Sequence, residues 1–243
     1  MKTFFGIAAL LVIGLLAFVF WSPSQEIDEH QMTTKTMSDE EMAEQMADLE
    51  GGNGENGQLV VESGVYMIDT EASSLLWAGQ KPLIDGYINT GSIAVKSGAI
   101  VVSDTGMTGD FTLDMNSLSV SATPIKPGKE SMLEEHLKGE RWFDVAGFPE
   151  ATFTIAEVTP QSGEGFLYDV VGDLTIKGQT HEVTFPATIY TDNEGVTYAE
   201  ATFGIDRTLW GITAGSSSFF DNLADNVVDD IVAMSFKLVA RSQ

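Results

Sequence analysis

The sequence predicts an all-β protein, a single antiparallel β-domain with one or two short helices, preceded by an N-terminal transmembrane helix. From residue 59 to the C-terminus, short runs of alternating apolar and polar residues follow one another, as in strands with one buried face. Clusters of Gly, Asn, Asp and Pro separate these runs, which is typical of turns. No regular alternation of strands with long helices appears, which argues against a parallel α/β sheet.

The first segment of the chain is apolar. Residues 3–21 carry no charge and would span roughly 28 Å as a helix, close to the hydrocarbon thickness of a bilayer. The apolar core of a cleaved signal is shorter, about 7–15 residues. We therefore expect residues 1–21 to be a membrane anchor or an uncleaved signal, with cleavage and secretion as the alternative. Lys2 and the amino terminus are the only positive flank of this segment, and the residues just after it are acidic. The positive-inside rule therefore places the remainder of the chain outside the cytoplasm, in the periplasm or at the cell surface.

Residues 22–57 contain ten acids and one Lys, with almost no aromatic or β-branched residues. Such a composition cannot bury enough apolar surface to fold, so it predicts an acidic flexible linker. The remaining residues, 58–243, form the barrel domain.

Within the barrel domain, residues 166–177 are the plainest strand, because Tyr168, Val170 and Leu174 fall on one face and Asp169 and Asp173 on the other. Residues 181–191 repeat the pattern, and the turn at 178–180 makes the two runs a hairpin. The other expected strands are 66–69, 75–80, 87–95, 99–103, 110–115, 151–158, 196–203 and 231–240, with turns that include 96–98 and 104–106. The expected helices are 130–138 and a short turn near 219–223.

Residues 136–153 read HLKGERWFDVAGFPEATF. The apolar side chains in and just before this stretch, Leu133, Leu137, Trp142 and Phe143, are suited to close one end of a β-structure, and Pro149 restricts the entry of the chain into the next strand. We interpret the segment as a plug, or lid, over the barrel end.

Composition argues against several functions. With 36 acidic and 12 basic residues the net charge is −24, which opposes nucleic-acid binding because phosphate contacts need Lys and Arg. There is no Cys, so disulfides and thiolate chemistry are absent. His136 and His181 are too isolated for a metal site, and the acidic run at 221–230 lacks the Gly and Glu of a calcium-binding loop. No motif selects a catalytic pair, so we expect no enzyme, no metal and no cofactor.

Three stretches in order resemble the YceI-like family: HLKGERWFDVAGFPEATF at 136–153, GDLTIKGQTHEVTF at 172–185 and FGIDRTLWGI at 203–212. Many members of that family carry a His where this chain reads GYINTG at 86–91. The resemblance implies a single lipocalin-like antiparallel β-barrel of about eight strands that holds an amphiphilic lipid, such as an isoprenoid or a quinone tail, in an apolar bore. It also implies an extracytoplasmic binding protein rather than an enzyme.

If the bore is hollow, inward-facing side chains and the plug would line it. The expected ligand-binding residues are Trp142, Phe143, Phe153, Phe166, Tyr168, Val170, Gly172, Leu174, Phe185, Ala187, Phe203, Arg207 and Trp210. Lys138 and Arg141 are the candidates for contact with a lipid head group. Arg207 fits a head-group phosphate or an ion pair with an Asp of this acidic chain. The same alternation of apolar and polar residues is expected in a barrel whose interior is filled by side chains. The alternative is therefore an envelope stress or interaction protein with a filled barrel and no ligand.

Overall fold

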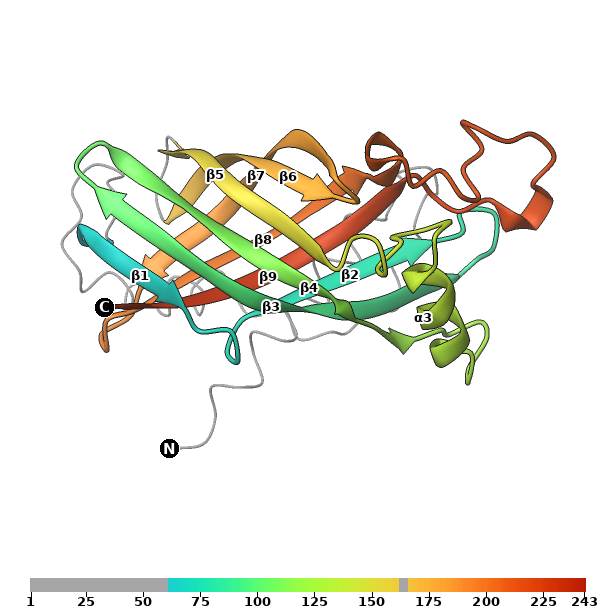
Figure 1. Ribbon diagram of the computed structural model, residues 1–243, viewed down its shortest axis with the longest axis horizontal. Coiled ribbons are helices and arrows are strands. Elements are labelled where there is room, and N and C mark those ends of the chain that lie inside the picture. The colour runs from blue at the N-terminus through green and yellow to red at the C-terminus, as the bar shows by residue number, and fades with distance from the viewer. Residues whose placement is uncertain (1–60, 162–165) are drawn as a thin grey trace, which may run out of the picture.

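The computed structural model of this protein, shown in Figure 1, describes residues 61–161 and 166–243. Nine antiparallel strands make up one sheet in this part of the chain. Their bounds are β1 (Gly64–Ile68), β2 (Ser74–Gln80), β3 (Ile88–Ser103), β4 (Gly106–Ala122), β5 (Glu150–Pro160), β6 (Leu167–Ile176), β7 (Gln179–Thr191), β8 (Val196–Asp206) and β9 (Ile231–Ser242). The described helices are α3 (Glu130–Lys138) and two short 3₁₀ helices, η1 (Arg207–Trp210) and η2 (Ala224–Asn226).

The sheet closes on itself. The strand order is β1-β3-β2-β9-β8-β7-β6-β5-β4, and β3 also pairs with β4 along most of its length. β1 and β2 share one position in the ring, because both lie between β3 and β9 and pair with successive halves of those two strands. Nine strands therefore form a barrel with eight positions, which confirms the predicted all-β fold and strand number and leaves no long free edge.

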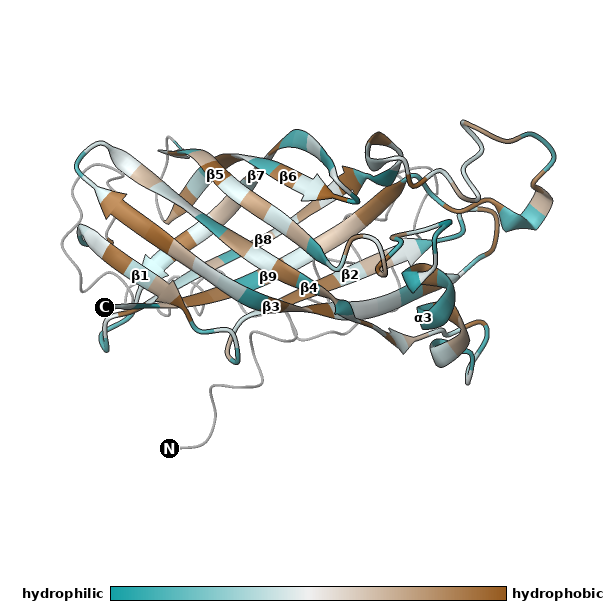
Figure 2. Cartoon of the chain, viewed as in Figure 1, coloured by the Kyte–Doolittle hydropathy of each residue, from teal (hydrophilic) through white to brown (hydrophobic). Residues whose placement is uncertain are grey.

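The hairpin predicted around residue 178 is confirmed. β6 and β7 are joined by Lys177 and Gly178, which have φ values of 50° and 71°. Both φ values are positive, as a two-residue turn matched to the strand twist requires. On β6, the residues from Tyr168 to Ile176 at every second position are buried. Figure 2 shows the same alternation of hydrophilic and hydrophobic residues along several strands of the wall.

The turn predicted at 96–98 is wrong. β3 runs unbroken from Ile88 to Ser103 and absorbs Lys96 as a bulge, because Val95 pairs with Leu113 while Ser97 pairs with Thr112. Gly98 is needed here for space: an added Cβ would lie 2.7 Å from the carbonyl oxygen of Asp110 and 2.6 Å from Ile68 Cδ1. The Gly and polar residues that resemble a turn therefore serve a bend in a long strand.

Helix α3 covers the residues predicted for it, 130–138. The short helix expected near 219–223 is instead η2, a few residues further along the chain. The predicted anchor at 1–21 and linker at 22–57 lie outside the described residues. In the part of the chain that is described, no helix combines the length and apolar character needed to cross a bilayer.

Candidate functional site

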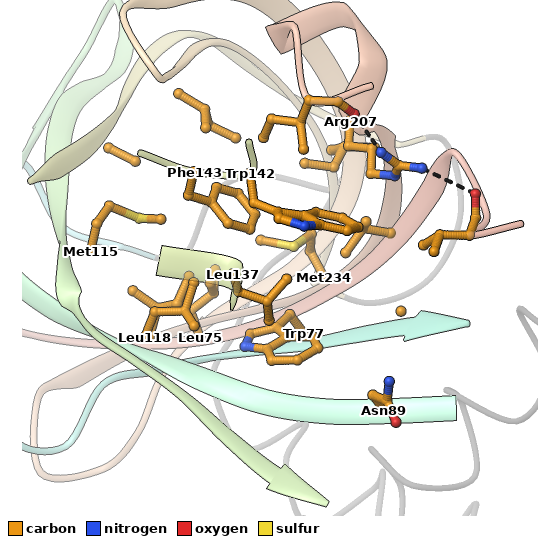
Figure 3. Close-up of a pocket in the computed structure, with 18 of the residues that line it drawn as sticks. Leu75, Trp77, Asn89, Met115, Leu118, Leu137, Trp142, Phe143, Arg207 and Met234 are labelled. Carbon is orange, nitrogen blue, oxygen red and sulfur yellow. Dashed lines mark hydrogen bonds between the residues drawn. The ribbon is translucent and has the colours of Figure 1, made fainter. Parts of the chain in front are cut away.

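The barrel contains a cavity of about 400 Å³ at the end that carries α3, within the range of small-molecule sites. Most of its wall is apolar, as Figure 3 shows for Leu75, Leu118, Met115 and Met234. Along β2 the cavity extends from Lys81 at the rim to Leu75, about 20 Å at roughly 3.3 Å per residue. An apolar chain fits this space, whereas a polar molecule would lose hydration without replacement partners.

Five phenylalanines form the inner boundary of the cavity. Phe111, Phe153, Phe185, Phe203 and Phe236 come from five different strands and contact one another in a closed ring, with centroids 4.1–6.2 Å apart. We call this group the Phe floor. Beyond it the second cavity measures only about 20 Å³, room for roughly one water molecule. The barrel is therefore hollow on the side of α3 and filled on the side of β1.

Gly172 positions one member of the Phe floor. An added Cβ on this residue would lie 2.3 Å from Cζ of Phe153 and 2.6 Å from the carbonyl oxygen of Thr154. The ring of Phe153 therefore occupies the space beside β6 that a side chain at this position would fill.

The segment that follows α3 lies over the cavity. Leu137, Trp142 and Phe143 all line it, and Figure 3 shows these side chains reaching toward its centre. The amide of Phe143 donates to the carbonyl of Leu137 (3.0 Å), which folds the segment back on α3. Lys177, at the β6–β7 turn, donates from Nζ to the carbonyls of Glu140 (2.8 Å) and Trp142 (3.0 Å). We call residues 139–149 the lid segment, since these bonds hold it against the barrel end.

Arg207 supports the opposite side of the mouth. Its guanidinium is 2 % exposed and donates to the carbonyls of Ile212, Val228 (3.0 Å) and Asp229 (2.9 Å), and to the carboxylate of Asp230 (3.3 Å). Burial lowers the pKa of Arg207, and the neighbouring Asp carboxylates oppose that shift. Its donors thus tie η1 to the 212–230 loop, while its face lies 5.3 Å from the ring of Trp142. Of the two roles predicted for Arg207, the ion pair with an Asp is present.

Polar and basic side chains gather at the rim. Lys81, Asn89 and Arg141 line the outer part of the cavity, and the ammonium groups of Lys81 and Lys126 lie 5.2 and 6.0 Å from the ring centroid of Tyr87. Lys138 instead pairs with Glu134 at 2.9 Å, and this hydrogen bond lowers the pKa of Glu134. Lys81 donates long hydrogen bonds of 3.4 Å to the Asp225 carbonyl and to Asn226 Oδ1, and it pairs with no carboxylate. Lys81 and Arg141 can therefore bind a polar or anionic group at the rim, whereas Lys138 already pairs with Glu134.

The structure brings eight of the fifteen predicted site residues together around the cavity and places seven outside its wall. The eight are Arg141, Trp142, Phe143, Phe153, Leu174, Phe185, Phe203 and Arg207. The seven are Lys138, Phe166, Tyr168, Val170, Gly172, Ala187 and Trp210. Tyr168, Val170 and Ala187 are buried on the inward face, but at positions beyond the floor, and the Trp210 indole donates to the Leu174 carbonyl at 3.0 Å.

Sequence reasoning missed the contribution of β2, β3 and the connection between them to the site. Trp77 of β2, Asn89 of β3, and Lys81 and Tyr87 of the connection all line the cavity. The alternation Leu75, Trp77, Gly79 already predicts which face of β2 points inward. The strand ends that surround the opening of the cavity, however, are determined by where α3 and the lid segment pack. No local sequence pattern predicts that packing.

The fold and the cavity define a class of protein: lipocalin-like antiparallel barrels that enclose a single apolar chamber under a helical cover. A model of the YceI-like domain matches residues 66–240. This chain belongs to the YceI-like family, and the resemblance noted in its sequence is confirmed.

Relatives of known sequence match shorter segments. A UPF0312 protein of Yersinia pestis (strain Pestoides F) is 45% identical over 51 residues, 21% of this chain and 25% of the relative. A UPF0312 protein of Vibrio vulnificus (strain YJ016) is 33% identical over 85 residues, 32% of this chain and 44% of the relative. The chain thus spans a quarter to less than half of the length of these two relatives.

Two solved structures share the fold at low sequence identity. BcnA of Burkholderia cenocepacia is similar with a TM-score of 0.54 and 22% identity, covering 71% of this chain and 98% of that protein. A polyisoprenoid binding domain of Saccharophagus degradans, implicated in plant cell wall breakdown, is similar with a TM-score of 0.55 and 18% identity, covering 75% and 100%. At these identities the two likenesses establish the barrel fold.

Proposed function

We propose that this protein is an extracytoplasmic binding or carrier protein for an isoprenoid or a similar amphiphilic lipid, which it holds in the barrel without chemical conversion. The observation that carries the proposal is the one-sided cavity: about 400 Å³, apolar in its depth, bounded by the Phe floor and covered by the lid segment. Membership of the YceI-like family and the similarity to a polyisoprenoid binding domain support the same ligand class.

In the proposed complex the apolar tail reaches the Phe floor and the polar end stays at the rim with Lys81 and Arg141. Known non-covalent complexes reach binding free energies of about 18–21 kcal/mol at most. Transfer of a long apolar chain from water into the cavity would exceed that limit. The relevant starting state of the lipid is a bilayer, and transfer from lipid to an apolar cavity is nearly neutral in hydrophobic energy. Selectivity therefore comes from the shape of the cavity and from polar contacts.

The proposed location follows from the N-terminal sequence. We place the barrel in the periplasm or at the cell surface, on a single membrane span at 1–21, or free if that segment is cleaved. As a flexible coil, the 36 residues of 22–57 would have an end-to-end distance of about 33 Å. Such a tether raises the local concentration of the barrel at the membrane that supplies its ligand.

Native mass spectrometry and lipid extraction of the purified full-length protein test the proposal. We expect a bound amphiphile of defined mass. Met115→Trp fills the cavity from its buried wall and should abolish the bound mass, while Met67→Trp, on the 43 % exposed outer face of β1, should keep it. An empty protein from its native host, with the same result for both variants, would favour the alternative of an envelope interaction protein without a ligand.

A further inference from the structure

The most exposed apolar side chains of the barrel gather at the end where the cavity opens. Among residues 61–161 and 166–243, six large hydrophobic side chains are between 47 % and 62 % exposed, and no other exceeds 43 %. All six lie on segments at that end: Leu83, Ile125, Met132, Leu209, Phe219 and Phe220. Single exposed apolar residues are common, but their concentration at one end of a molecule indicates a surface that contacts another apolar phase.

Three loops around the mouth carry four of these side chains and contact one another. Leu83 lies in the β2–β3 connection, Ile125 in the chain before α3, and the two phenylalanines in the loop after η1. Lys81 donates to the Asp225 carbonyl at 3.4 Å, and an added Cβ on Gly86 would lie 3.8 Å from Cδ1 of Ile125. Figure 1 shows the β2–β3 connection and the loop after η1 at the end that carries α3, beyond the strands. We call residues 81–87, 123–129 and 216–226 the mouth surface.

The backbone beneath the two phenylalanines is fixed. The amides of Phe219 and Phe220 donate to the carbonyl of Ser216 at 3.3 and 3.1 Å, and Ser216 is fully buried. Ser218 Oγ donates to the carboxylate of Asp230 at 2.7 Å. Because the loop is anchored in this way, the exposure of the two rings is a property of the folded protein, and covering them would release free energy.

Unpaired cations lie at the same end. On the barrel wall, three basic residues are each in an ion pair with a carboxylate: Lys96, Lys237 and Arg241. Within the described ranges, the basic residues that form no ion pair lie near the mouth: Lys81, Lys126, Lys129, Arg141 and Lys177. The mouth surface also carries Asp85, Asp221 and Asp225. Charges of both signs complement zwitterionic phospholipid head groups, whereas the acids would repel an anionic layer.

The chain that precedes the barrel is long enough to let the mouth face a membrane. β1 begins at the opposite end, because Gly64 pairs with Val102 near the end of β3, whereas the cavity residue Asn89 is at the start of β3. Residues 22–60 could extend over at most about 130–140 Å. The 16 residues of β3 cover only about 50 Å. A barrel held by residues 1–21, as proposed above, can therefore turn its mouth to the same bilayer.

We propose that the mouth surface is a membrane-contact site, at which Leu83, Ile125, Phe219 and Phe220 enter the interfacial layer of a zwitterionic phospholipid bilayer. Side chains on separate loops suit a fluid layer that adapts to them, whereas a partner protein requires one continuous complementary patch. The contact places the cavity opening against the lipid phase, so the ligand enters without crossing water. This inference rests on the proposed function and specifies how its ligand is taken up.

Single-cysteine labelling of the full-length protein tests the contact. The chain contains no Cys, so Phe220→Cys provides one attachment site for an environment-sensitive fluorophore, and Leu83→Cys provides a second position. Val101→Cys, exposed on the outer wall of the filled half, is the matched control. The probe is a phosphatidylcholine vesicle in which some lipids carry a nitroxide on the acyl chain. We expect the nitroxide to quench labels at 83 and 220 and to leave the label at 101 unquenched.

Removal of the two rings supplies a second readout. Phe219→Ser with Phe220→Ser should lower the docking equilibrium constant about tenfold, measured from the quenched and unquenched lifetimes of a label at 83. Neither phenylalanine lines the cavity, so the mass of bound amphiphile in native mass spectrometry should be unchanged. The control pair Val65→Ser with Val101→Ser removes two exposed apolar side chains from the other end and should leave quenching unaltered. Phosphatidylglycerol in the vesicles should not increase quenching, and a large increase would overturn the assignment to a zwitterionic layer.

Different results would overturn different claims. Equal quenching at 220 and 101 would show that the barrel adsorbs without a specific face. A spectral change at 220 without quenching, together with a dimeric mass in light scattering, would show that a second copy covers the mouth surface. Without quenching at either 83 or 220 the membrane contact is wrong, while a bound amphiphile would leave the carrier function standing. Quenching at both positions with a cavity that is always empty would support the contact and refute the carrier function.

Discussion

Gly172 is a residue whose missing side chain shapes the cavity, since Phe153 occupies the space where a Cβ would lie. We expect Gly172→Ala to lower the free energy of unfolding by about 1–3 kcal/mol, the usual cost of overpacking. Urea unfolding measures this loss. In the double variant with Phe153→Leu the loss should be smaller than the sum of the two single losses, because the smaller side chain removes the clash with the ring and leaves only the one with the Thr154 carbonyl.

Gly79→Ala is the matched control, because an added Cβ at this strand glycine meets no atom within 4 Å. Its unfolding midpoint should stay close to that of the unaltered protein. A strictly additive double variant would show that Gly172 is required for another reason than the ring of Phe153.

Ionisation of Tyr190 is expected to lower the stability of the protein at alkaline pH. Burial, together with the charges of Glu200 and Asp192, raises its pKa to about 12. Because the folded protein favours the neutral phenol, the neutral Tyr190 side chain contributes to the free energy of unfolding. That contribution is complete below the unfolded pKa near 10 and is lost as the pH rises toward 12. Urea unfolding at several pH values should therefore show a fall in stability above pH 10.

In Tyr190→Phe that fall should be shallower, although the raised pKa values of Tyr66 and Tyr198 preserve part of it. The same steepness in both proteins would show that Tyr190 titrates normally in the folded state.

At the scale of elements, apolar packing and a small set of hydrogen bonds hold the lid segment against the barrel. Lys177 provides two of them through the carbonyls of Glu140 and Trp142. We expect Lys177→Met to speed amide hydrogen exchange in residues 139–149 and to speed ligand release, at a cost of only about 0.5–1.5 kcal/mol in global stability. Hydrogen exchange followed by mass spectrometry measures the local effect.

Lys237→Met removes a comparable surface lysine, whose Nζ lies 3.4 Å from Glu200 on the barrel wall. It should leave exchange in the lid segment unchanged. Equal exchange in the lid segment of both variants would mean that Lys177 does not hold the lid.

At the scale of the whole molecule, the net charge of −24 opposes the compact state through self-repulsion. Raising the salt concentration from about 0.01 M to about 0.15 M shortens the Debye length from roughly 30 Å to roughly 8 Å. We therefore expect the thermal midpoint to rise with NaCl. The described residues contain no group of three or more metal-ligating side chains, so CaCl₂ at equal ionic strength should give the same rise. A calcium-specific rise would reveal a binding site in the acidic loops.

Local pattern was sufficient for much of the fold. Period-two alternation marks which face of a strand is buried, and together with the turn at residue 178 this predicted the β6–β7 hairpin. The strand number of the barrel came from the resemblance to the YceI-like family. Local pattern failed at residues 96–98, because a Gly beside polar residues has the same composition in a turn and in a bulge. The difference lies in β4, whose backbone passes too close to Gly98 for a side chain.

The candidate site was predictable only in part. The sequence motifs directed attention to Trp142, Phe143 and Phe153, which line the cavity, and to Val170, Ala187 and others, which do not. All of these residues point inward, and alternation is silent about the height along the barrel axis at which each lies.

The sequence by itself determined that the chain forms antiparallel strands with one buried face, because burial of one strand face imposes a period of two, and its motifs indicated the barrel through their resemblance to the YceI-like family. Only the tertiary structure decided where that interior is hollow, because five phenylalanines from separate strands meet at one level and fill it there.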